Sequence, residues 1–265
     1  MPLLFAALSG FLGGITLVIG AAVAWFVQIP RTVVAGVMAF GAGVLISALA
    51  YELVQEANDG GGLLPTIVGF VVGALLYVGA DWMLSKRAAN QAAGSETGHR
   101  HRGKSVSSRN VTHRRQSGSS DENSGKVIAM GALIDGIPES IVLGLSVTAT
   151  GGLSLPIVLA IAISNVPESL SSTSELKSSG QSARYVFSLW SGIALISTAA
   201  AFLGYALLRN SPDELIAVIT TVAAGGLLAM VCNTMIPEAF AEERRLTGLW
   251  ATLGFLTAFS LHELG

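Results

Sequence analysis

The chain has 265 residues, of which 51% are hydrophobic and only 12% are charged, and its formal net charge is −2. Soluble domains carry about 25% charged residues, so this composition excludes an ordinary soluble domain and predicts an integral membrane protein in contact with lipid. No nucleic-acid partner is expected. The single cysteine, Cys232, allows no internal disulfide and no zinc-finger site.

Eight apolar segments are long enough to cross a membrane, since a helical span needs about 20 mostly apolar residues. The N-terminus lacks a positively charged region, so the first segment is expected to be a retained span rather than a cleaved signal peptide. The predicted fold is therefore all-α and polytopic. The expected spans are Pro2–Phe26, Thr32–Gln55, Leu63–Ser85, Lys126–Thr148, Leu153–Leu176, Arg184–Leu208, Asp213–Phe240 and Leu246–Glu263.

One long polar stretch, Lys86–Gly125, divides the transmembrane part into residues 1–85 and 126–265, which are expected to form one domain. The stretch is rich in Ser, Gly and Arg and contains His99, His101 and His113. Its composition cannot build a core, so it is predicted to be disordered. A solvated basic linker is the favoured interpretation of its histidines, and a weak, exchangeable metal sink is the alternative.

The positive charges predict the orientation of the spans. All of the 15 Lys and Arg residues except Arg209 fall in the loops that join spans 1–2, 3–4, 5–6 and 7–8. Loops rich in Lys and Arg stay on the cytoplasmic side. We therefore expect a multi-pass protein of the cell membrane with both termini outside and the basic linker in the cytoplasm.

A weak internal repeat links spans 2 and 7. The stretch from Gly43 to Ala57 parallels the stretch from Gly225 to Ala239 without gaps. An odd number of crossings separates the copies, so they would have opposite orientations. Inverted repeats around a central site are common in transporters. Chance similarity between apolar segments is an equally weighted alternative.

Spans 4 and 5 carry the same short motif, Pro138-Glu139-Ser140 and Pro167-Glu168-Ser169. A carboxylate inside a membrane span is costly and is by default a hypothesis of function. Each proline also disturbs the bond to the carbonyl four residues before it, which frees the carbonyls of Ile134 and Ile163. Freed carbonyls near carboxylates make an oxygen-rich site for a cation.

Further polar residues share a helix face with these glutamates. Asp135 lies one turn before Glu139, and Ser164 and Asn165 lie one turn before Glu168. No lysine or arginine stands at matching depth, and buried charges are paired or coordinate a metal. We expect Asp135, Glu139, Asn165 and Glu168 to form a hard cation site, with protonated carboxyl groups as the alternative, and Glu139 to face Glu168 across the interface of spans 4 and 5.

Three more glutamates lie near span ends. Glu52 and Glu56 form a pair in span 2, and Glu238 shares a face of span 7 with Thr234. An interfacial position and a place on the cation pathway are equally consistent with them. At the end of span 8, His262 and its neighbour are expected to be a solvated tail, with an entrance site as the minority interpretation.

These residues together resemble the ZIP (Zrt-, Irt-like protein) family of divalent metal transporters. The resemblance covers nearly the whole chain, from the eight spans and outside termini to the His-bearing loop and the Pro-Glu motifs of spans 4 and 5. Span 2 is also similar, with Ala-Gly-Val-Leu followed by Glu52-Leu-Val-Gln-Glu56-Ala57. The resemblance implies eight helices in a 3+2+3 inverted-repeat arrangement around a metal centre at the membrane midplane.

The chain departs from the family pattern inside that implied centre. Span 4 of the family usually reads His-Asn-x-Pro-Glu-Gly, whereas here Asp135 stands in place of the histidine and Gly136 in place of the asparagine. Ser164 stands where span 5 often has histidine. An oxygen-only centre suits magnesium and manganese, although the Irving–Williams order still favours zinc over manganese.

The expected function is transport of divalent transition-metal cations into the cytoplasm, zinc first, with manganese or iron as alternatives. The metal is the substrate, no resident cofactor is expected, and a homodimer is a possible assembly. A non-transporting metal sensor or degenerate paralogue is the main alternative. An intramembrane protease ranks lowest, because Gly-x-Gly-Asp is absent and His262-Glu263 has no second histidine to complete His-Glu-x-x-His. The protein is therefore not expected to be an enzyme.

Overall fold

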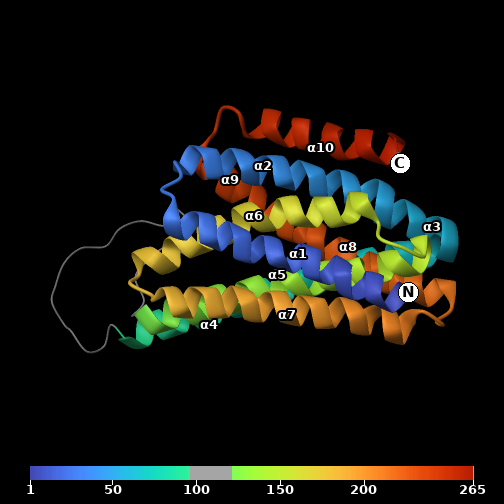
Figure 1. The fold of residues 1–265 in the computed structure, drawn as a ribbon, viewed down its shortest axis with the longest axis horizontal. Helices are drawn as coiled ribbons and strands as arrows, with labels where there is room; N and C mark the ends of the chain where they lie inside the picture. The colour runs from blue at the N-terminus through green and yellow to red at the C-terminus, as the bar shows by residue number, and fades with distance from the viewer. Residues whose placement is uncertain (96–120, 265) are drawn as a thin grey trace.

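A computed structural model describes residues 1–95 and 121–264 of the chain, and within these residues all regular secondary structure is helical (Figure 1). The prediction of an all-α protein is confirmed. The π-helical segments η1 and η4 each continue an α-helix. The elements are α1 (Pro2–Phe26), α2 (Arg31–Ala48), η1 (Leu49–Val54), α3 (Gln55–Gly61), α4 (Leu63–Ser95), α5 (Asp121–Thr150), α6 (Leu155–Ser178), α7 (Ala183–Leu208), α8 (Asp213–Met230), η4 (Val231–Met235), α9 (Ile236–Glu242) and α10 (Thr247–Leu264).

Seven helical segments of the described chain are long and apolar enough to cross a membrane, as expected for a multi-pass protein. They are Pro2–Phe26, Arg31–Gly61, Leu63–Lys86, Gly131–Thr148, Leu155–Ser178, Ala183–Leu208 and Asp213–Glu242. The eighth predicted segment, Leu246–Glu263, is helical as α10 but is not among them. Helix α10 has 18 residues, which include several Thr and Gly, one Ser, His262 and Glu263. These residues lower its mean hydropathy.

The polar linker is shorter than the sequence predicted. Helix α4 continues to Ser95 and α5 begins at Asp121, so the prediction of disorder over Lys86–Gly125 is wrong at both ends. Alanines favour helix after Arg87, and the acidic Asp121 and Glu122 suit a helix N-terminus. Residues 96–120, with all three linker histidines, lie outside the described residues.

Both chain termini lie at one end of the bundle, and the linker-side ends of α4 and α5 lie at the other (Figure 1). The helices pack in two sets. In one, α1 packs along α6 and α7, and α5 packs along α7; in the other, α2 packs along α10, and α4 along α8. The sets meet where α2 contacts α6 and where α5 contacts α8, and the main apolar core lies at this junction.

The two helices that carry the weak sequence repeat have the same architecture. Arg31–Ala48 and Asp213–Met230 are both 18-residue helices, each followed by a π-helical segment and then a seven-residue helix. They run in opposite directions (Figure 1). Gly43 and its equivalent Gly225 also make the same contact, because a Cβ on either one would overlap a backbone carbonyl of the neighbouring helix. This agreement supports a true repeat over chance similarity.

Candidate metal centre

Helix α5 brings two carboxylates into the interior of the bundle. Asp135 and Glu139 lie one turn apart and are 5% and 4% exposed. Their carboxyl groups are close enough to interact electrostatically. Pro138 does not interrupt α5. The Ser140 hydroxyl donates to the Gly136 carbonyl of its own helix at 2.6 Å. The shared face predicted for Asp135 and Glu139 is confirmed.

Helix α6 adds an amide beside these carboxylates. Asn165 is 3% exposed, and its Nδ2 donates to the Gly13 carbonyl of α1 at 3.0 Å. Its side chain also lies next to the Glu139 carboxyl group. Two buried oxygen atoms here, Glu139 Oε1 and Asn165 Oδ1, have no hydrogen-bond partner among the described residues. Oxygen atoms of different helices that are buried and unsatisfied at one place are the arrangement expected of an oxygen-ligand site.

A hydrogen-bonded chain from two further helices reaches Asp135, and the sequence analysis missed it. Tyr77 of α4 donates its phenolic proton to Asp135 Oδ1 at 3.0 Å. The same phenolic oxygen lies 3.3 Å from Oγ1 of Thr234 in η4. The available signal was a single tyrosine in the middle of span 3, within a run of apolar residues and glycines from Ile67 to Ala80. Asp135 thereby joins α5 to α4 and η4.

The other two predicted site residues of α6, Ser164 and Glu168, are not shown to belong to this cluster. Ser164 is buried, but its hydroxyl donates to the Ile161 carbonyl of its own helix at 2.9 Å. Glu168 is half-buried and has an interaction partner. Helices α5 and α6 touch only over a short stretch, since α1 packs against both. The pairing of Glu139 with Glu168 therefore stays a prediction, and no three His, Cys, Asp or Glu side chains of the described residues are close enough to hold a metal ion.

The remaining three glutamates lie apart from this centre. Glu238 of α9 is half-buried and accepts a hydrogen bond from the Ser171 hydroxyl of α6 at 2.7 Å. Glu56 is exposed. Glu52 of η1 lies 2.7 Å from Nδ1 of His262, through its Oε1. The expectation of a solvated tail is therefore wrong for His262, because α10 packs along α2 and carries this ring onto Glu52.

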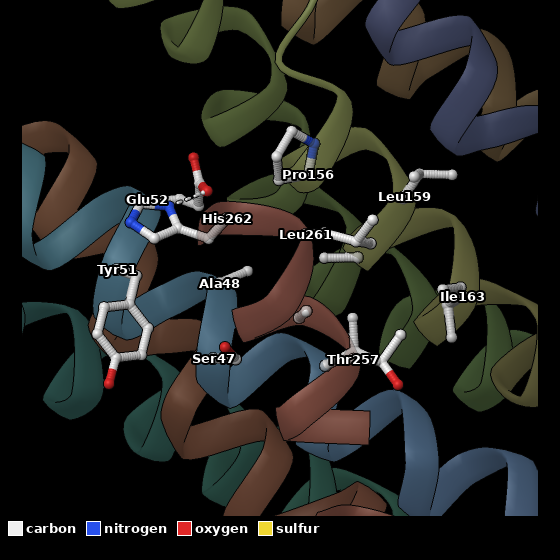
Figure 2. Close-up of a pocket in the computed structure, with 13 residues that line it drawn as sticks. Ser47, Ala48, Tyr51, Glu52, Pro156, Leu159, Ile163, Thr257, Leu261 and His262 are labelled. Carbon is white, nitrogen blue, oxygen red and sulfur yellow. Dashed lines mark hydrogen bonds and ion pairs between the residues drawn. The ribbon is translucent and has the colours of Figure 1, made fainter. Parts of the chain in front are cut away.

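The Glu52–His262 pair stands at the edge of a groove between η1, α2, α6 and α10 (Figure 2). The groove encloses about 350 Å³, counting the part that is open to the outside, and its lining extends from this pair to Ile163 of α6. The Tyr51 ring lies against the His262 ring, with centroids 5.6 Å apart. The groove thus runs from a polar pair to the middle of the helix that carries Asn165.

The buried cluster of Asp135, Glu139 and Asn165, together with Tyr77 and Thr234, is the candidate metal centre. It offers two carboxylates and one amide oxygen in an apolar interior, a ligand set that suits a hard or borderline divalent cation. The chain matches no protein-family model and no curated protein sequence, so these residues alone carry the functional inference.

Proposed function

We propose that this protein is a transporter that moves divalent metal cations across a membrane through a centre formed by Asp135, Glu139 and Asn165. One observation carries the proposal: Glu139 Oε1 and Asn165 Oδ1 are buried on neighbouring helices and have no hydrogen-bond partner in the described part of the chain. A buried acceptor left unsatisfied costs about 1–3 kcal/mol. A cation bound between these oxygens would remove that cost and neutralise the adjoining carboxylates.

The composition of the centre favours a transported ion over a permanently held one. A structural metal site is closed by a full set of protein ligands. Here Asp135, Glu139 and Asn165 supply an incomplete set, which leaves positions for water. A transport site must bind its ion well enough to admit it and weakly enough to release it. An incomplete oxygen shell meets both requirements.

The wider architecture is consistent with the ZIP-like arrangement that the sequence resembles. In this proposal α10 is the eighth span, both termini face the outside, and cations enter the cytoplasm. The termini lie together at one end of the bundle, as an even number of crossings requires (Figure 1). Zinc is the proposed main cargo because the Irving–Williams order favours it, and the oxygen ligands also admit manganese or iron.

Uptake into liposomes that contain the purified protein tests the proposal. The wild type is expected to accumulate zinc, and to different extents manganese, iron, cobalt and cadmium, above protein-free liposomes. Glu139→Ala should lose uptake and still insert, because removing one of two neighbouring carboxylates relieves repulsion. The matched control is Glu263→Ala, since Glu263 is exposed near the end of α10.

Three outcomes separate the possible functions. Uptake that depends on Glu139 supports transport through the proposed centre. Metal binding without uptake would instead identify a non-transporting sensor. Uptake by Glu139→Ala at the wild-type rate would show that cations do not pass through this centre.

A further inference from the structure

The Glu52–His262 pair joins two helical segments that also pack closely without it. Glu52 belongs to η1 and His262 to α10, and their Oε1 and Nδ1 atoms lie 2.7 Å apart. Gly43 of α2 and Gly254 of α10 each lie against a backbone carbonyl of the facing helix. Ion pairs in contact with solvent contribute little to stability. The two side chains can therefore separate while α2 and α10 stay packed.

The two side chains direct a nitrogen and an oxygen atom at one small volume. Within the described residues, Glu52 and His262 make no hydrogen bond or ion pair other than the one between them. Imidazole nitrogen and carboxylate oxygen both bind zinc, with bonds of about 2.0–2.2 Å. Two such ligands on a tetrahedral ion stand about 3.4 Å apart. A cation can therefore enter between these atoms if they separate by less than about 1 Å.

The imidazole ring is held in place by a neighbour other than Glu52. The Tyr51 ring lies 5.6 Å from the His262 ring, between centroids, and 5.2 Å from the ring of Phe259 on the same helix. A metal ligand is more effective when its surroundings fix its orientation. The Glu52 and His262 side chains are also 16% and 32% exposed, so an ion can reach them.

The charges around the pair attract cations. Glu56 lies one turn after Glu52, and the two carboxyl groups are close enough to interact electrostatically. A cation beside them relieves the repulsion between like charges. The segments α3, the start of α8 and the end of α10 lie at the end of the bundle that holds both chain ends (Figure 1). They carry the exposed carboxylates Asp59, Asp213, Glu214 and Glu263. Such a surface raises the local concentration of cations.

We propose that Glu52 and His262 form a second metal site at the edge of the groove, which captures divalent transition-metal cations on their way to the centre. This inference rests on the proposed function, since the centre is the destination of the captured ion. The groove extends from the pair to Ile163, two residues before Asn165 on α6. Two protein ligands leave the other positions to water, so the ion is held loosely and released readily.

The ligand types decide which cations this edge site takes. His262 is the only histidine among the described residues. Imidazole suits zinc, copper, iron and nickel, whereas magnesium and calcium prefer oxygen ligands. The edge site is therefore selective for transition metals, a preference that the oxygen-only centre does not supply by itself.

Copper binding followed by electron paramagnetic resonance tests the edge site, because a bound imidazole nitrogen splits the Cu²⁺ signal. The chain has four histidines, so replacing the three linker histidines with Gln leaves only His262. Glu139→Ala is added to disable the centre. This protein, purified without a histidine tag, is expected to show the splitting of one imidazole. His262→Gln should abolish the splitting, and Glu52→Gln should weaken copper binding about tenfold or more.

Glu263→Gln is the matched control for Glu52→Gln. It removes the same charge from the same end of the bundle, at an exposed residue next to His262. It should change the copper affinity far less, because it removes no ligand. Thermal unfolding checks that each variant is folded. Glu52→Gln leaves α10 unchanged, so it keeps the test decisive if His262→Gln unfolds.

Zinc uptake by liposomes that contain the otherwise unchanged protein tests the capture role. Glu52→Gln and His262→Gln should each raise the KM for zinc about tenfold, with a much smaller change in the maximal rate. Capture matters when zinc is scarce, whereas at saturating zinc the intact centre limits the rate. Glu139→Ala, in contrast, should lose uptake at every zinc concentration.

The outcomes separate this inference from the proposed function. If Glu139→Ala loses uptake and the imidazole splitting is absent, only the edge site is refuted. Splitting that is present while both edge variants keep the wild-type KM would refute the capture role. If Glu139→Ala transports normally while the splitting is present and the KM rises in the edge variants, the edge site stands and the proposed centre falls.

Discussion

The interface of α2 with α10 and the interface of α8 with α4 have the same glycine–carbonyl backbone contacts but different polar side chains. A Cβ on Gly43 would overlap the carbonyl of Ala251, and a Cβ on the equivalent Gly225 would overlap that of Phe70. The reciprocal contacts match as well. Gly254 of α10 lies against the Phe40 carbonyl of α2, and Gly73 of α4 lies against the Val222 carbonyl of α8.

The side chains at equivalent positions separate the two interfaces. Where the first has Glu52 paired with His262, the second has Thr234 and Asp81. Where α4 has Tyr77, α10 has the buried Ala258, whose methyl group cannot make a hydrogen bond to another helix. At the first interface, Glu52 and His262 contact each other between the two packed segments. At the second, Tyr77 makes a hydrogen bond to Asp135 of a third helix, α5.

This difference teaches that the repeat is a property of the backbone packing and not of the site. Glycines let each pair of helices approach closely whatever the polar residues are. One interface has a partly exposed acid–histidine pair, and the other has a buried hydrogen-bonded chain to the candidate metal centre. Three experiments test this account.

The largest effect is expected at the two equivalent glycines. Gly43→Ala and Gly225→Ala each force a methyl group into a backbone carbonyl, so both should lower the free energy of unfolding by about 1–3 kcal/mol. Gly248→Ala is the control, because a Cβ there meets nothing within 4 Å. Thermal unfolding in detergent measures all three. A loss at only one of the two interfacial glycines would break the comparison.

The next effect concerns the chain that only the second interface possesses. Asp135→His replaces an oxygen ligand with a nitrogen ligand that suits zinc. The zinc-to-manganese uptake ratio should rise by roughly tenfold, a size typical of changes in the surroundings of a metal. Asp213→His, at the exposed first residue of α8, is the control. An unchanged ratio would show that Asp135 is not a ligand.

The smallest effect is expected at the first interface. The Glu52 and His262 side chains are 16% and 32% exposed, and ion pairs in contact with solvent contribute about 0.2–1 kcal/mol to stability. A double-mutant cycle of Glu52→Gln and His262→Gln, followed by thermal unfolding, should give a coupling energy in this range. A much larger coupling energy would mean that the pair, and not the glycine contacts, holds α10 on α2.

Local patterns in the sequence were enough to predict much of the fold. Apolar length predicted the seven helical segments of the described chain that are long and apolar enough to cross a membrane, and the one-turn spacing of Asp135 and Glu139 predicted their common face. The ungapped repeat around Gly43 and Gly225 was balanced against chance similarity, and the two helices turned out to have the same architecture. These features depend on neighbours a few residues away, or on composition over about 20 residues, and both can be read along the chain.

The polar contacts between distant parts of the chain, those of the candidate centre among them, were decided by the tertiary structure. Tyr77 meets Asp135 across 58 residues, Asn165 meets the Gly13 carbonyl across 152, and His262 meets Glu52 across 210. No periodicity connects such positions, because helix periodicity says which face a residue occupies and not which other helix that face will meet. The sequence by itself therefore determined the helices and their acidic faces. Only helix packing decided that Asp135 is held by a tyrosine and that Glu139 lies beside an amide, since close packing at the glycines sets which faces come together.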